Sequence, residues 1–295
     1  MIISKLMGGL GNQMFQYAAG RSLAHKHGVD LKLDISYFQS CQLRKYALEV
    51  FNIGSSFATQ EEIEALTTRK VGIAERIYNR IRRRPARPPA SYIDQTCRIE
   101  PHVLFDSEIL NLSDNIYLDG YWQSEKYFID IESIIRREFA INIPLNEDIN
   151  EIAKEIASCE SVNIHIRRSD YVSNKHTNQY HGVCSLDYYY QCIEQLVKII
   201  KKPYFFIFSD DPQWVRDNLK TSYPFKIIEG NLDKGYEDLR LMSLCRHHII
   251  ANSSFSWWGA WLNPQKDKIV FVPKQWFAQE DLNINDIVPD SWTKI

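Results

Sequence analysis

Two adjacent arginines, Arg167 and Arg168, follow a short apolar segment and are themselves followed by Asp170. A guanidinium group binds phosphate oxygens through paired, charge-assisted hydrogen bonds, so two arginines at the end of a strand suit a diphosphate. The alternative is a surface ion-pair cluster in which Asp170 neutralises one arginine, and such clusters contribute little to stability. These residues alone leave both interpretations open.

A second polar group is the turn Asn252-Ser253-Ser254-Phe255, which lies between an apolar segment and a helical one. Hydroxyl groups and backbone N–H groups at a helix N-terminus can bind a phosphate. The plainer interpretation is that Ser253 or Ser254 only caps the helix. We expect the three tryptophans that follow to pack in the core rather than to face a sugar: Trp257, Trp258 and Trp261.

Acidic residues occur at two further places. Asp238 lies in a helical segment, and a carboxylate there can accept both the N1–H and the exocyclic amine of guanine, although an acid in a first helical turn is also favoured by the helix dipole. The pair in Ser209-Asp210-Asp211 invites a divalent metal, but an Asp-x-Asp metal-binding pattern occurs nowhere in the chain. Asp211-Pro212 is typical of a helix start, so we favour a structural or nucleoside-facing role.

The N-terminal loop Gly8-Gly9-Leu10-Gly11-Asn12-Gln13 is rich in small residues. Small residues let the backbone approach a ligand closely, and the following helix offers free N–H groups to an anion. Asp34 adds to a partial likeness to a dinucleotide fingerprint, but Met14 stands where the third glycine is expected. The loop therefore predicts a ligand-facing turn rather than a nicotinamide site, with a turn that binds nothing as the alternative.

The elements that must position these residues alternate between strand and helix, which predicts an α/β protein with parallel sheets. In the first half we expect strands at 1–6, 31–35 and 115–118, and helices at 13–27, at 61–84 and up to about 140. In the second half we expect strands at 162–166, 204–208, 225–228, 248–251 and 269–272, and helices at 187–201, 213–219 and 236–245. The candidate residues then gather at the carboxyl ends of the strands, where open parallel sheets bind ligands.

Bulk composition excludes several classes of protein. The chain has 295 residues, enough for two domains, and its 24% charged and 44% hydrophobic residues are typical of a globular protein. A net charge of -2 gives no overall attraction to nucleic acid or to an anionic membrane, so any anion site must be local. Six scattered cysteines without a C-x-x-C pair indicate reduced thiols in the cytoplasm rather than zinc or disulfides. We find no secretory signal and no apolar run that could span a membrane.

A basic segment, residues 76–87, forms an amphipathic helical pattern with isoleucines at 73, 77 and 81. Two interpretations stay open, a solvated helix face and peripheral contact with the anionic surface of the cytoplasmic membrane.

Taken together, GGLGNQMFQYA, HIRRSDY, FSDD and DLRLMSLCRHHIIANSSFSWWGAWLNP resemble the bacterial α-1,2-fucosyltransferases of glycosyltransferase family 11. The likeness spans nearly the whole chain. It implies two facing Rossmann-like domains with a cleft between them, the GT-B-like arrangement, with residues 1–145 on the acceptor side and 146–295 binding GDP-fucose. It also implies inverting transfer of L-fucose, without a metal cofactor, to O2 of a terminal galactose, such as that of lactose or a surface glycan like an O-antigen.

The resemblance also assigns roles to individual residues. Arg167 would bind the β-phosphate of the donor, and His165 and Asp238 would contact guanosine. The turn Asn252-Ser253-Ser254-Phe255 would line the pyrophosphate and base pocket. The donor sugar and the acceptor would meet four residues of the N-terminal loop: Gly9, Gly11, Asn12 and Gln13.

Two motif residues have open roles. Arg168 is either a donor ligand or a packing partner. Asp170 is a candidate catalytic base, but an arginine can occupy it fully, and an oxocarbenium-like path with phosphate assistance needs no side-chain base.

Three other functions compete with this one. A transferase for another GDP-sugar or another linkage shares all these features. An NAD(P)-dependent oxidoreductase would use the N-terminal loop and Asp34. A non-catalytic glycan-binding module would use the aromatic residues, but it has no need of the paired arginines.

Overall fold

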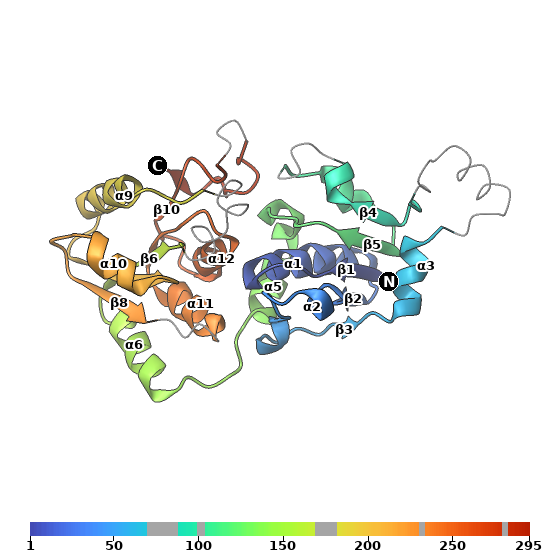
Figure 1. Ribbon diagram of the computed structural model, residues 1–295, viewed down its shortest axis with the longest axis horizontal. Helices are drawn as coiled ribbons and strands as arrows, with labels where there is room; N and C mark the ends of the chain where they lie inside the picture. The colour runs from blue at the N-terminus through green and yellow to red at the C-terminus, as the bar shows by residue number, and fades with distance from the viewer. Residues whose placement is uncertain (70–87, 99–103, 169–181, 230–233, 279–282) are drawn as a thin grey trace. The chain divides into compact units, whose positions relative to one another are not determined.

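The computed structural model describes residues 1–69, 88–98, 104–168, 182–229, 234–278 and 283–295. Two of the sequence predictions, Asp170 and the basic segment 76–87, lie outside these ranges. The chain folds into two compact units. Unit 1 contains Met1–Glu49 and Ile53–Phe139, and unit 2 contains Val50–Asn52 and Ala140–Ile295 (Figure 1).

Unit 1 is built on a parallel sheet of five strands within the described residues, in the order β3-β2-β1-β5-β4. The strands are β1 (Ile2–Lys5), β2 (Leu31–Asp34), β3 (Ser56–Phe57), β4 (Tyr92–Asp94) and β5 (Ile116–Asp119). Successive side chains of β1 and β5, which point to opposite faces of the sheet, are buried, as expected for strands covered on both faces. The strands that follow β1 in the chain lie on both sides of it, β2 and β3 on one side and β4 and β5 on the other, so the winding of the sheet reverses between β1 and β5.

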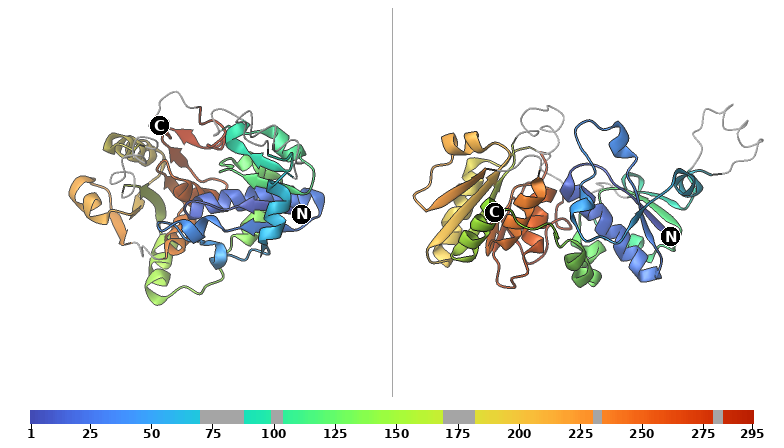
Figure 2. Two further views of the ribbon diagram at one scale, coloured as in Figure 1. Left: turned by 45° about the vertical axis from the view of Figure 1, so that its right-hand side comes forward. Right: turned by 90° about the horizontal axis from the view of Figure 1, so that it is seen from below.

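The described residues of unit 1 form the helices α1 (Leu10–His27), α2 (Tyr37–Ser40), α3 (Gln60–Thr67) and α5 (Glu132–Glu138). Short 3-10 helices span Leu48–Val50, Gln95–Cys97, Ser107–Asn111, Glu125–Tyr127 and Ile129–Ile131. Helix α1 lies along the sheet (Figure 2) and ends at Gly28, whose φ of 63° suits a glycine. It begins three residues before the predicted start, so that Gly11, Asn12 and Gln13 belong to its first turn.

Two of the helices predicted in unit 1 differ from the elements that the structure describes. The one predicted over 61–84 begins as α3 with a capping box at Thr59 and ends at Thr67, since Thr68 is already extended; residues 70–84 of that prediction lie outside the described ranges. The one predicted to end near residue 140 is two 3-10 turns followed by α5.

Unit 2 contains, in its described part, a parallel sheet of six strands in the order β11-β10-β9-β6-β7-β8. They are β6 (Glu160–Ile166), β7 (Pro203–Ser209), β8 (Phe225–Glu229), β9 (His247–Ile249), β10 (Val270–Val272) and β11 (Thr293–Lys294). Counted along the chain this is the order 3-2-1-4-5-6 of the doubly wound Rossmann fold. The direction of winding therefore reverses between β6 and β9.

Helices cover both faces of this second sheet: α6 (Glu147–Ala157), α9 (Leu186–Ile199), α10 (Pro212–Asn218), α11 (Gly235–Leu244) and α12 (Ser254–Leu262). One core cluster joins α9 and α10 to the alternate residues Val162, Ile164 and Ile166 of β6. A second cluster joins α6 and α11 to Phe206 and Phe208 of β7. Within the described ranges, no helix combines the length and the apolar character needed to cross a lipid bilayer.

The three tryptophans of α12 belong to the core, as predicted. Trp257 and Trp258 are fully buried and Trp261 is 3% exposed. The indole N–H of Trp257 donates to the backbone oxygen of Ile287 at 2.7 Å, so its one polar atom is satisfied. These side chains pack α12 against the rest of unit 2 and so hold in place the turn that precedes α12.

Candidate functional site

The candidate residues of unit 2 lie at the carboxyl edge of its sheet, where the winding reverses. Strands β6 and β9 are direct neighbours, with Ile164 paired to Ile249. Arg167 follows the end of β6, and the turn Asn252-Ser253-Ser254-Phe255 follows β9. In open α/β sheets this is the place where ligands bind. Segments more than 80 residues apart in the chain are thereby brought to one edge.

Arg167 is oriented by Asp210, which follows the neighbouring strand β7. The pairing of Ile166 with Ser209 places these two residues side by side. Arg167 Nη1 lies 2.9 Å from Asp210 Oδ2, and the backbone N–H of Arg168 donates to Asp210 Oδ1 at 2.8 Å. One carboxylate therefore fixes both the main chain and the guanidinium group. The Arg167 side chain remains 23% exposed, which leaves it accessible to an anionic ligand.

Arg168 packs against α10. Its guanidinium carbon lies 3.7 Å from the centre of the Trp214 ring, and its Nε lies 3.6 Å from Asp211 Oδ2. Asp211 also caps α10 by accepting a hydrogen bond from the Trp214 N–H at 3.1 Å, with Pro212 in the first turn. The helix start predicted from Asp211-Pro212 is confirmed. This geometry suits Arg168 to holding the site together through a cation–π contact.

In the turn before α12, Asn252 is anchored by hydrogen bonds, whereas Ser253 is buried but does not cap the helix with its side chain. The amide of Asn252 is held at both ends, donating to Trp276 O at 3.1 Å and accepting from Cys184 Sγ at 3.4 Å. Ser253 is the N-terminal cap residue of α12, but its hydroxyl makes no capping hydrogen bond, so the plain capping role is wrong for Ser253. The first-turn N–H groups of α12 and this hydroxyl are suited to an anion.

Phe255 of α12 lies between His165, near the end of β6, and Gly235, at the start of α11. Their ring centres are 5.8 Å apart, and a Cβ added to Gly235 would lie 3.8 Å from the Phe255 ring. His165 is 4% exposed, and its Nδ1 is buried without a hydrogen-bond partner among the described residues. Burial, followed by the charge of Arg167, lowers the pKa of His165 to about 3. The imidazole is therefore neutral near pH 7.

Asp238 lies in the first turn of α11. Burial, and then the neighbouring Glu237 carboxylate, raise the pKa of Asp238 to about 7. A carboxyl group that is costly to ionise in the free protein gains most when a ligand supplies hydrogen-bond donors. Perturbed acids of this kind are common at functional sites.

In unit 1, the N-terminal loop is tied into the local structure. Gly8 has a φ of +76°, and a Cβ there would lie 2.7 Å from Asn12 Nδ2. Gln13 is fully buried; its Nε2 donates to Gly8 O and Lys45 O, and its Oε1 accepts from Ala47 N. Asn12 Oδ1 accepts from Gln123 at 2.8 Å. Gly11 is buried in α1, whereas a Cβ on Gly9 would meet nothing within 4 Å.

Asp34 is buried and bound to its neighbours rather than presented to a ribose. It is 3% exposed, and its two oxygens accept hydrogen bonds from Ser36 N at 2.8 Å and Tyr117 OH at 2.6 Å. The acid at this position of a dinucleotide-binding fold binds the ribose hydroxyls. The geometry thus disfavours the oxidoreductase alternative.

Sequence reasoning missed the pairing of Asp210 with Arg167 and the stacking of Arg168 on Trp214. One of its two open interpretations had the neighbouring Asp170 neutralise an arginine, and Asp170 lies outside the described residues. The FSDD sequence at the end of a strand was the available signal, but the sequence does not show that β7 lies next to β6.

Residues 93–295 match the protein family described as Glycosyl transferase family 11. The whole chain is 34% identical to the alpha-1,2-colitosyltransferase of Escherichia coli, of which the match covers 99%. It is 33% identical to the O-antigen biosynthesis glycosyltransferase WbnK of Escherichia coli, with 99% of each protein covered. It is also 27% identical to a galactoside 2-alpha-L-fucosyltransferase of Caenorhabditis elegans, over 69% of this chain and 59% of that protein.

A solved structure shows the same fold. The NodZ alpha-1,6-fucosyltransferase, in crystals soaked with GDP-fucose, matches with a TM-score of 0.52 and 15% identity, covering 92% of this chain and 94% of that one. The predicted fold class, α/β with two Rossmann-like units, is confirmed by this likeness and by the two parallel sheets.

Proposed function

The chain belongs to glycosyl transferase family 11, and from that premise we propose that it transfers L-fucose from GDP-fucose to O2 of a terminal galactose, with inversion at the anomeric carbon. The observation that carries this proposal is the grouping of Arg167, Ser253 and Asp238 at the carboxyl edge of the unit 2 sheet. This grouping offers a cation and helix N–H groups to a diphosphate and a carboxylate to a guanine base.

The proposed mechanism follows from where charge develops. As the galactose O2 attacks the fucose C1, the bond from C1 to the β-phosphate oxygen breaks and the proton of the galactose hydroxyl would pass to the departing diphosphate. Until that proton arrives, negative charge grows on the β-phosphate and positive charge on the sugar ring. Arg167, held by Asp210 at 2.9 Å, and the N-terminus of α12 would stabilise the phosphate charge without reorganising. His165 and Phe255 would contact the guanosine, and Asp238 would accept hydrogen bonds from its base.

A second candidate donor carries colitose, which is fucose without the hydroxyl group at C3. The colitosyltransferase that matches this chain over its whole length favours it specifically. Both sugars are 6-deoxy sugars, so the nucleotide contacts proposed for unit 2 serve either donor. Discrimination between GDP-fucose and GDP-colitose then depends on whether a protein group is placed to bind the C3 hydroxyl of fucose.

The acceptor context is part of the same proposal. The match to an O-antigen glycosyltransferase supports a bacterial surface glycan, and the match to a galactoside 2-alpha-L-fucosyltransferase supports a terminal galactose. Assembly of such a glycan would place the enzyme on the cytoplasmic side of the membrane, in peripheral contact with it.

The test is a donor comparison with lactose as acceptor, read by GDP release and by mass analysis of the sugar. We expect fucosylated lactose from GDP-fucose at the highest kcat/KM, and equal rates with and without EDTA, because Arg167 and helix N–H groups neutralise the phosphate charge. GDP-colitose and GDP-mannose serve as comparison donors. A clear preference for GDP-colitose would select the second candidate, and turnover that stops with EDTA would contradict the metal-free mechanism.

A further inference from the structure

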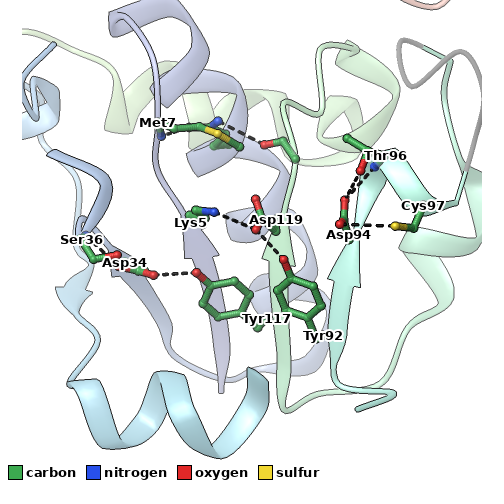
Figure 3. A network of polar contacts seen from close by, with 12 residues as sticks. Lys5, Met7, Asp34, Ser36, Tyr92, Asp94, Thr96, Cys97, Tyr117 and Asp119 are labelled. Atoms are coloured by element: carbon green, nitrogen blue, oxygen red, sulfur yellow. Dashed lines mark hydrogen bonds and ion pairs between the residues drawn. The ribbon is translucent and has the colours of Figure 1, made fainter. Parts of the chain in front are cut away.

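Unit 1 carries a row of charged residues at the carboxyl edge of its own sheet. The strand register aligns Lys5 with Asp34 on one side, and Asp119 with Asp94 on the other, while Ser4 pairs with Leu118 just below. Lys5 Nζ lies 2.8 Å from Asp119 Oδ2, and Tyr92 OH donates to the same oxygen at 2.7 Å (Figure 3). The row therefore centres on the carboxylate of Asp119.

The Asp119 carboxylate keeps one oxygen for a ligand. Both of its hydrogen bonds end on Oδ2, and no residue in the described part of the chain bonds to Oδ1. The Asp119 side chain is 14% exposed and that of Lys5 is 29% exposed. A partly buried carboxylate that two neighbours hold in place can accept hydrogen bonds from sugar hydroxyls without losing side-chain entropy.

An exposed aromatic ring stands beside this pair. Tyr121 is 37% exposed. It follows Asp119 by two residues in the chain. Burial, and then the Asp119 charge, raise the pKa of Tyr121, and the Lys5 charge lowers it. A ring for the apolar face of a sugar next to charged hydrogen-bonding groups is the usual composition of a saccharide site.

The loop that carries Tyr121 has an energetically unfavourable backbone conformation at the next residue. Trp122 is fully buried with a φ of 53°, a conformation that a bulky residue keeps only when its surroundings enforce it. Gln95 Oε1 enforces it by accepting from the N–H groups of Tyr121 at 2.7 Å and Trp122 at 3.1 Å. Gly120 leaves no space for a side chain, since a Cβ there would lie 2.6 Å from Gln95 Cβ. The backbone that carries Tyr121 is therefore held in place.

Charge and topology indicate which ligand this place accepts. The carboxyl edges of β1 and β5 meet where the strand order of unit 1 reverses, which is where such a sheet binds ligands. Three carboxylates, Asp34, Asp94 and Asp119, stand against the single cation of Lys5 in this row. A diphosphate would be repelled here, whereas a neutral sugar would not.

We infer that Lys5, Asp119 and Tyr121 form a saccharide subsite on unit 1 that binds the terminal galactose of the acceptor. The inference rests on the proposed function and deepens it, because it assigns the acceptor to residues distinct from those proposed for the donor. Asp119 accepts hydrogen bonds from hydroxyls of the galactose, and the Tyr121 ring stacks on the apolar face of the sugar.

The kinetic test compares Tyr121→Ala and Asp119→Asn with the wild-type enzyme. We expect KM for lactose to rise about 10-fold or more in each, since a hydrogen bond to a charged group is lost in one and a stacking surface in the other. The Kd for GDP-fucose should stay within about twofold of the wild-type value, because the donor residues of unit 2 are untouched. Tyr223→Ala is the matched control, since Tyr223 has the same 37% exposure but precedes β8 in unit 2.

A second measurement is independent of turnover. Saturation-transfer NMR with methyl β-galactoside should show sugar contact with wild-type protein and with Tyr223→Ala, and a strongly reduced signal with Tyr121→Ala. Equal signals in all three proteins, or an unchanged lactose KM in both variants, would overturn the subsite. If wild-type protein made no fucosylated lactose, the proposed function would fail, and the NMR comparison would still decide whether unit 1 binds galactose at Tyr121.

Discussion

Arg167→Ala should lower kcat/KM for GDP-fucose by about 10²–10³-fold, the usual loss when a preorganised contact to developing charge is removed. Arg167 is the proposed partner of the β-phosphate, and Asp210 fixes its guanidinium group at 2.9 Å before any ligand arrives. Arg167→Lys should recover only part of the activity, since an ammonium group lacks the planar fork that binds two phosphate oxygens. Steady-state kinetics with lactose would measure both losses.

The matched control for this variant is Arg246→Ala. Arg246 also forms an arginine–carboxylate ion pair on unit 2, with Glu160 at 2.9 Å, but Glu160 begins strand β6 at the opposite edge of the sheet. Its removal should leave kcat/KM unchanged within about twofold. Thermal unfolding of both variants would separate a lost contact from a lost fold. Wild-type kinetics in a stably folded Arg167→Ala enzyme would contradict the role of Arg167.

Asp238→Asn should weaken GDP binding by about 10- to 100-fold, because two hydrogen bonds to a charged carboxylate are lost. Inosine diphosphate provides a control on the ligand, since it lacks the exocyclic amine of guanine. Wild-type protein should bind GDP more tightly than inosine diphosphate, and Asp238→Asn should lose most of that preference. A variant that still preferred GDP as strongly as the wild type would show that another group recognises the base.

The same residue predicts how donor binding depends on pH. Burial raises the pKa of Asp238 to about 7, and only the ionised form would accept both of the hydrogen bonds that we propose from guanine. Affinity for GDP-fucose should therefore fall as the pH is lowered through 7 and level off above it. GDP-fucose carries no phosphate that titrates near neutral pH, so the ligand itself adds no such dependence. Calorimetry between about pH 6 and about pH 8 would test this, with Asp238→Asn expected to show no such slope.

Motifs and hydrophobic patterns predicted most of the architecture of unit 2. The strand predicted at 204–208 became Pro203–Ser209, and the helix predicted at 187–201 became Leu186–Ile199. These elements have long apolar patterns and clear ends, such as the Ser185 cap and the Asp211-Pro212 start. The candidate donor residues follow strand ends, so predicting the strands also predicted the edge at which they gather.

Other elements could not be predicted because their signals are short or non-local. Strands β3 and β11 have two residues each, too few to show any alternation. Helix α6 was missed although Asn146 caps it and Ile149, Ile152 and Ile156 recur at helical spacing. The partnership of Arg167 with Asp210 depends on the register of β6 with β7, which no local pattern shows. The alignment of Lys5, Asp94 and Asp119 likewise exists only because β5 lies between β1 and β4, which the sequence does not show.

The transfer of fucose to O2 of galactose that we propose for this family 11 enzyme is tested most directly by incubating the protein with GDP-fucose and lactose in EDTA. The linkage of the purified product is then assigned by NMR. We predict a single product with α-fucose on O2 of the galactose ring. Fucose at any other position, or intact GDP-fucose after incubation with active protein, would contradict the account.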